Sequence, residues 1–264
     1  MNIFVRELKA NLKSLIIWST IIALFILVGV AKFSAYYNNP DMLAILNSLP
    51  ASVIDAMSLR AFNLTTLNGF YGIMFIYFAL LGGIAAAMWG SDSISKEERD
   101  KTVEFSLVLP VTRSRVITAK ALAAVVNCIV LVLISAVVSV GVAQRYNPDP
   151  SFYKLLTLEM EAMLIIELIF LAVGLLLGCV MKQYKLASTF GIAIILVTYF
   201  FSIITVLKQN LDFLKYLTPF KYFDAAQMYK DGRMEGTYLL LSTAIIVVCV
   251  VVAYLTYNRR DLYI

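Results

Sequence analysis

The chain has 264 residues, of which 61% are hydrophobic and 15% are charged, and its formal net charge is +5 at pH 7. Because soluble globular domains are only about 45–50% apolar, this composition indicates an integral membrane protein. Histidine is absent, which excludes Ser-His and Cys-His nucleophiles and His-based zinc sites. There is also no Gly-x-x-x-x-Gly-Lys phosphate loop for ATP hydrolysis, and no basic stripe interleaved with aromatic residues that would indicate nucleic-acid binding.

Six apolar runs are long enough to cross a bilayer, which takes about 20 mainly apolar residues. The first run is followed by Tyr36-Tyr37-Asn38 instead of a small-x-small cleavage site, so we expect a retained span. The sequence therefore predicts an all-α integral membrane protein, one domain over residues 1–264. Its six transmembrane helices are expected at residues 15–35, 69–88, 116–142, 155–180, 186–207 and 238–257.

Residues 1–14 are predicted to form an amphipathic helix that precedes the first span. At 3.6 residues per turn, one side collects apolar residues and the opposite side collects basic residues. The apolar side holds Phe4, Leu8, Leu12 and Leu15, and the basic side holds Arg6, Lys9 and Lys13. Such a helix is expected to lie flat at the membrane interface with its bases toward anionic headgroups.

Between the first two spans, residues 38–68 are predicted to lie outside the membrane, bracketed by Pro40 and Pro50. Apolar residues with helical spacing indicate one short interfacial helix there. These residues are Met42, Ile45, Leu46 and Leu49.

A segment of dense mixed charge, residues 91–120, separates the second and third spans. Ser95 and Glu98 have the spacing of a capping box, which predicts the start of a new helix. After Lys101 a short apolar stretch around Phe105 follows, too brief to span a bilayer, and Pro110 ends it. The segment is either a solvated loop or, as we favour, a cytoplasmic coupling helix within residues 91–115 that docks into a groove on a soluble partner.

Two polar residues fall inside predicted spans. Glu167 lies near the middle of the fourth span, where an unpaired carboxylate is costly, and Gly174 and Gly178 follow on the same helix face. A Gly-x-x-x-Gly spacing allows close helix packing, so we expect Glu167 to face protein, as a structural residue or as part of a substrate path. Asn127 in the third span has the same two interpretations.

Two further acids in the fourth span, Glu159 and Glu161, are placed near its outer end by the sequence, where they would reach the headgroups.

The outer loop, residues 208–236, is rich in aromatic residues, among them Phe220 and Tyr222. Aromatic residues commonly mark the membrane interface. The alternative is an outer lid over a substrate path, built from one or two short helices.

The charged segment carries a motif of an acid, Thr-x-Glu, Pro-x-x-Arg and a later Lys, read here as Glu97, Thr102, Glu104, Pro110, Arg113 and Lys120. It resembles the signature of the type-2 family of ATP-binding-cassette (ABC) transporter permeases, although Lys101 stands where that family often has glycine. The resemblance extends to Arg6–Lys9, Thr218–Asp224 and Arg259–Leu262, and so covers essentially the whole chain.

The resemblance implies a non-enzymatic membrane subunit without a cofactor or metal of its own. Two such subunits, identical or different, would each rest on a separate ABC ATPase that binds ATP and Mg²⁺. The residues implied to couple the chain to that ATPase are Glu97, Glu98, Thr102, Glu104, Phe105, Pro110 and Arg113. The expected substrate path comprises Glu167, Asn127, Phe220 and Tyr222, and Gly174 and Gly178 are expected to serve helix packing.

With six spans, both termini and the charged segment share one side of the membrane, and that side holds more than half of the 22 basic residues. By the positive-inside bias this side is the cytoplasm, in a multi-pass protein of the plasma membrane. The expected function is ATP-driven export of an amphipathic peptide or drug. The alternatives are a self-sufficient carrier or channel using Glu167, which internal repeats would support, and an intramembrane enzyme, disfavoured by the absence of paired aspartates.

Overall fold

The computed structural model describes residues 3–37, 62–99, 112–181, 183–207 and 209–259, together with 39, 41, 44–45, 48–50 and 53–54. Of residues 95–99, 184–185 and 209–210 it describes the backbone only. In this part of the chain all regular structure is helical, as predicted.

Six helices are long and apolar enough to cross a membrane, which confirms the predicted number of spans. They are α1 (Ile3–Phe33), α4 (Leu67–Arg99), α6 (Arg113–Ala143), α7 (Pro150–Val180), α8 (Tyr184–Leu207) and α11 (Gly236–Arg259). In the described stretches after Ala143, short helices connect the spans: η1 (Gln144–Tyr146), η2 (Gln209–Leu217), α9 (Pro219–Tyr222) and α10 (Ala225–Asp231).

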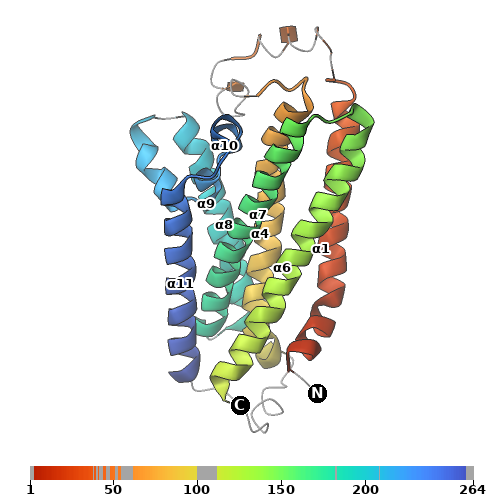
Figure 1. Cartoon of the computed structure of the whole chain (residues 1–264). Coiled ribbons are helices and arrows are strands. Elements are labelled where there is room, and N and C mark those ends of the chain that lie inside the picture. The colour runs from red at the N-terminus through yellow and green to blue at the C-terminus, as the bar shows by residue number, and fades with distance from the viewer. Residues whose placement is uncertain are drawn as a thin grey trace.

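The spanning helices lie roughly side by side, and the start of α1, the end of α4, the start of α6 and the end of α11 are all at one end of the bundle (Figure 1). We call this the terminal end. The opposite end carries η2, α9 and α10 and is called the loop end (Figure 1). The predicted outer loop of residues 208–236 therefore contains short helices.

Helices α4 and α7 form the centre of the bundle. About two thirds of the apolar stretch of each is buried, 67% and 61%, whereas only 17% and 11% are buried in α8 and α11. Because little of their surface contacts protein, α8 and α11 are peripheral and expose apolar side chains such as Phe200 and Leu240. This is the exposure expected of helices that face lipid.

Glycines allow the backbones of α4 and α7 to approach closely, as the spacing of Gly174 and Gly178 predicted. A Cβ atom added at Gly174 would collide with the carbonyl oxygen of Ala87 on α4, and one at Gly178 would lie 2.8 Å from that of Ser91. From the other side, a Cβ at Gly90 would collide with the backbone of α7. Small residues on both helices thus set their separation.

The helix starts follow from local sequence. Thr112 caps α6, with its hydroxyl accepting a hydrogen bond from the amide of Arg115. Asp149 caps α7 in the same way through the amide of Phe152, and Pro150 occupies the first turn. The amide of Phe152 and the hydroxyl of Ser151 lower the pKa of Asp149, because both hydrogen bonds favour the charged carboxylate.

The structure corrects the expectation of a separate helix over residues 1–14. From Ile3 onward this segment is the first part of α1, continuous with the span, because neither proline nor glycine interrupts it before Gly29. Its polar residues Glu7 and Asn11 are buried, whereas Leu12 is exposed. The side of this helix that contacts the bundle is therefore partly polar.

No helix begins at Ser95, contrary to the capping-box interpretation, because α4 continues through this residue to Arg99. The sequence from Ser91 to Arg99 contains no proline or glycine, and successive turns satisfy their own amides without a cap. Of the short helix expected around residues 42–49, Met42 and Leu46 lie outside the described residues.

The glycine packing gives a matched test. We expect Gly174→Ala to lower the melting temperature, because the added methyl group forces α4 and α7 apart at a cost of about 1–3 kcal/mol. Gly141→Ala is the control, since a Cβ there meets no atom within 4 Å, and alanine favours the helix by about 0.5–1 kcal/mol. Equal melting temperatures for the two variants would contradict this account of the packing.

Candidate functional site

At the terminal end, the start of α6 is bound to the last turns of α11. The Arg113 guanidinium donates a hydrogen bond to the carbonyl oxygen of Tyr257, with Nη1 3.4 Å away. Ser114 and Asn258 are joined side chain to side chain at 3.3 Å. The point where the chain enters α6 is therefore held against the neighbouring helix.

Lys120 joins α6 to α4 at the same end. Its side chain is 1% exposed, and Nζ donates a hydrogen bond of 2.7 Å to the carbonyl oxygen of Ser93. A buried ammonium is tolerated only when hydrogen bonds replace its hydration. The motif included Lys120, but its burial and its partner could not be predicted from the sequence.

Two further contacts extend this connection to α1 and α8. Trp89, one turn before Ser93, donates its indole N–H to the hydroxyl of Ser14 at 2.9 Å. Ser188 at the start of α8 lies 2.8 Å from the Ser91 hydroxyl and donates to Asp92 at 3.2 Å. Side-chain hydrogen bonds thus connect α1, α6 and α8 to the last four turns of α4.

Most of the predicted coupling residues cannot be placed. Thr102, Glu104, Phe105 and Pro110 lie outside the described residues, and Glu97 and Glu98 are described only as backbone in the final turns of α4. Arg113 lies in the first turn of α6. Within the charged segment, the structure therefore positions the residues on either side of 100–111: Arg99 at the end of α4 and Thr112 just before α6.

Glu167 lies inside the bundle, as predicted. Its side chain is fully buried, facing Gly82 of α4, with the Cys128 thiol of α6 beside its carboxyl group. Apart from this thiol, which is a weak donor, no described residue hydrogen-bonds either carboxylate oxygen, and Nδ2 of Asn127 has no partner among the described residues. Glu167 therefore faces protein, toward α4 and α6, and not lipid.

Glu159 does not reach the headgroups as expected. It is fully buried, with no hydrogen-bond partner for either oxygen among the described residues, whereas Glu161 is exposed. Two residues along a helix correspond to a rotation of about 200°, so these acids face opposite sides of α7. Only the packing of α7 against its neighbours decides which of the two is buried.

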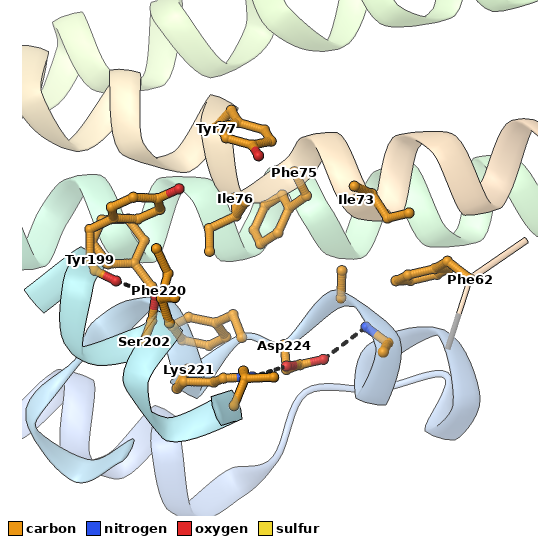
Figure 2. Close-up of a pocket in the computed structure, with 16 residues that line it drawn as sticks. Phe62, Ile73, Phe75, Ile76, Tyr77, Tyr199, Ser202, Phe220, Lys221 and Asp224 are labelled. Carbon is orange, nitrogen blue, oxygen red and sulfur yellow. Dashed lines mark hydrogen bonds and ion pairs between the residues drawn. The ribbon is translucent and has the colours of Figure 1, made fainter. Parts of the chain in front are cut away.

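A cavity opens at the loop end of α4 and α8. It has a volume of about 250 Å³ and lies between α4, α8 and the segment that carries α9 and α10 (Figure 2). Aromatic side chains form much of its wall, and two of them, Tyr77 and Tyr199, carry hydroxyl groups (Figure 2). The aromatic lining residues are Phe62, Phe75, Tyr77, Tyr199, Phe220 and Phe223.

An ion pair forms one edge of this cavity. Lys221 Nζ lies 2.7 Å from Asp224 Oδ2, and the other oxygen of Asp224 accepts the amides of Ala226 and Gln227 to cap α10 (Figure 2). Because Asp224 already serves as a helix cap, the pair is held in place by the backbone. The cavity therefore presents an apolar interior next to fixed charges.

Phe220 and Tyr222, the two outer-loop residues predicted to lie on the substrate path, have different surroundings in the structure. Phe220 lines the cavity, whereas Tyr222 stacks on Tyr238 of α11, with ring centroids 5.2 Å apart and an interplanar angle of 7°. The Tyr222 hydroxyl donates to the carbonyl oxygen of Tyr216, and burial raises the pKa of Tyr222 to about 12. Neither Tyr222, Asn127 nor Glu167 lines this cavity.

Sequence reasoning assigned no site role to the polar cavity residues, which are Tyr77, Tyr199, Ser202, Lys221 and Asp224. Tyr199 and Ser202 lie about one turn apart on α8, and Lys221 and Asp224 have the spacing of a local ion pair. Those signals exist in the sequence, but they do not show that α4, α8 and α9 meet.

Comparison with known proteins gives one positive finding. The model of a family described as "ABC-2 family transporter protein" matches residues 1–262. No curated protein matches the chain.

The Lys120 contact yields a prediction for the terminal end. We expect Lys120→Met to lower the unfolding free energy by about 1.5–3 kcal/mol, the usual contribution of a hydrogen bond to a charged group, while the methionine retains most of the apolar contacts. Arg115→Met is the control, because Arg115 is exposed at the same end of α6. Thermal unfolding of both variants and the wild type in detergent measures the difference. If Lys120→Met unfolded at the same temperature as the wild type, the contact would not be stabilising.

Proposed function

Because this chain belongs to the ABC-2 family of transporter proteins, we propose that it is the transmembrane subunit of an exporter that moves an amphipathic peptide or drug outward. As a permease of this family it is a multi-pass membrane protein that works with an ABC ATPase. The observation that carries the proposal is the family match over residues 1–262, joined to a chain that has no phosphate loop of its own.

In this proposal the segment between α4 and α6 contacts the ATPase. Its two ends are fixed to the bundle, because Lys120 connects α6 to α4 and Arg113 connects α6 to α11. A force applied to the segment would therefore act on several helices together and shift the population between inward-facing and outward-facing states. Glu97, Glu98, Thr102, Glu104, Phe105, Pro110 and Arg113 are the proposed coupling residues.

The cavity at the loop end supports an amphipathic substrate. Its aromatic wall would accept an apolar group, while the Lys221–Asp224 pair lies at its edge. Ligand sites commonly combine an apolar lining with a few fixed polar groups. We propose that Phe220 contacts substrate there, whereas the packing of Tyr222 on Tyr238 supports a structural role.

The proposed assembly is a dimer of membrane subunits, identical or different, on two ATPase subunits that hold ATP and Mg²⁺. The terminal end faces the cytoplasm of the cell, in agreement with the excess of basic residues assigned to that side. The loop end then faces outward, which places the aromatic cavity on the side where an exported substrate leaves.

A second candidate function is a self-sufficient carrier with Glu167 as a proton or cation site. The observation that favours it is the complete burial of Glu167 and Glu159, for which the described residues supply no donor other than the weak Cys128 thiol beside Glu167. Intramembrane carboxylates often mark ion pathways. In the exporter, Glu167 and Asn127 would instead contribute to the substrate path within the membrane.

The two functions differ in their dependence on a partner. We expect the purified chain alone to hydrolyse no ATP and to transport nothing in proteoliposomes, because it lacks a phosphate loop. Co-expression with the ATPase subunit should yield a complex that hydrolyses ATP. A catalytically inactive ATPase variant is the control for contaminating activity, and ion or proton transport by the chain alone would favour the carrier.

The cavity can be tested by filling it. We expect Ser202→Leu to reduce substrate-stimulated ATP hydrolysis by the complex while basal hydrolysis and folding are retained, because the leucine occupies space that the substrate would use. The Ser202 hydroxyl bonds only the Tyr199 carbonyl of its own helix among described residues, so its loss costs little. Thr198→Leu, one turn away on α8 and outside the cavity lining, is the control. Equal stimulation in both variants would remove the cavity from the substrate path.

A further inference from the structure

A second apolar groove lies at the loop end, between α1 and α6, which run side by side in Figure 1. It has a volume of about 430 Å³. Its apolar wall is formed by Leu27, Val30 and Ala31 of α1 and by Gly141 and Val142 of α6. Gly141 widens it, because the position of its missing Cβ has no atom within 4 Å.

Arg145 of η1 lines the same groove where α6 ends. Its side chain is exposed, and it forms no ion pair with a described residue. A second exposed base, Lys32, lies in the last turn of α1, which is also at the loop end of the bundle. The groove is thus apolar along its length and basic at its outer limit.

Aromatic rings place the outer limit of the groove at the level of the membrane interface. Phe33, Tyr37 and Tyr146 pack edge to face, with centroid distances of 4.9–5.6 Å. Tyr146 also lines the groove and donates its hydroxyl to the carbonyl oxygen of Val30 at 3.4 Å. Because tyrosine clusters of this kind sit at headgroup level, Arg145 lies where a phosphate group would be.

We propose that this groove binds an anionic phospholipid of the leaflet at the loop end. One acyl chain lies between α1 and α6, and the phosphate pairs with the Arg145 guanidinium, whose planar donors suit phosphate oxygens. The inference uses only the membrane location of the chain and does not rest on the proposed transport function.

A neighbouring groove supports the choice of an anionic lipid. On the other side of the same half of α6, a more apolar groove of about 320 Å³ has the exposed carboxylate Glu161, and no basic residue, among its lining residues. The two grooves therefore differ in the sign of their charge. Anionic headgroups are attracted to the first and repelled from the second.

The test uses the full chain in nanodiscs of phosphatidylcholine and phosphatidylglycerol in equal parts. Native mass spectrometry after gentle extraction measures which lipid remains bound. We expect the wild type to retain phosphatidylglycerol in preference, and Arg145→Gln to reduce that preference roughly fivefold, the effect of one base near an anionic headgroup. Arg145→Lys should restore part of the preference.

Two further variants complete the test. Arg233→Gln removes an exposed arginine at the loop end that does not line the groove, so its lipid preference should equal that of the wild type. Gly141→Leu should reduce retention of the lipid by filling the groove. An unchanged preference in Arg145→Gln would overturn the proposal. So would efficient disulfide cross-linking of two chains through Gly141→Cys, because a second copy would then cover the groove.

Discussion

The close approach of α4 and α7 is the contact on which the rest of the bundle depends. In a bilayer there is no hydrophobic difference between lipid and an apolar helix surface, so helices associate through close packing and internal hydrogen bonds. Gly90, Gly174 and Gly178 bring the two backbones to a separation that a single methyl group would prevent. The remaining four spans pack around this pair, and the outermost, α8 and α11, keep most of their apolar surface for lipid.

This central pair also explains how the two ends of the molecule differ. At the terminal end, side-chain hydrogen bonds of Lys120, Trp89 and Ser188 connect three other helices to α4. At the loop end, α4 and α8 separate enough to leave a cavity that α9 and α10 cover. Helix α8 takes part in both, since Ser188 is near its start and Ser202 lines the cavity. A movement of α8 relative to α4 would therefore affect both ends.

The buried polar groups in the middle of the bundle also depend on contacts within the protein, because lipid offers them no hydrogen-bond partner. Glu159, Glu167 and Asn127 occupy positions where an unpaired polar atom costs several kcal/mol in hydrocarbon, about 2–7 for an amide or hydroxyl. Among the described residues, the carboxylate of Glu159 and Nδ2 of Asn127 have no hydrogen-bond partner, and the carboxylate of Glu167 has only the weak donor Cys128 beside it. Groups retained at such a cost are commonly functional, and here they lie on α6 and α7.

The sequence by itself determined the number of spans, the burial of Glu167 and the role of Gly174 and Gly178, because hydrophobic run length and helical spacing are local properties. The same local rules were wrong where a helix continued through a position that the sequence marked as the start or end of a helix. The capping spacing at Ser95 gave no new helix within α4, and residues 3–14 became part of α1. Only the tertiary structure decided that Glu159 is buried while Glu161 is exposed, that Lys120 bonds Ser93, and that Phe220 lines a cavity while Tyr222 packs on α11. Each of these depends on which helix faces which, and contacts between segments distant in the chain leave no periodic pattern in the sequence.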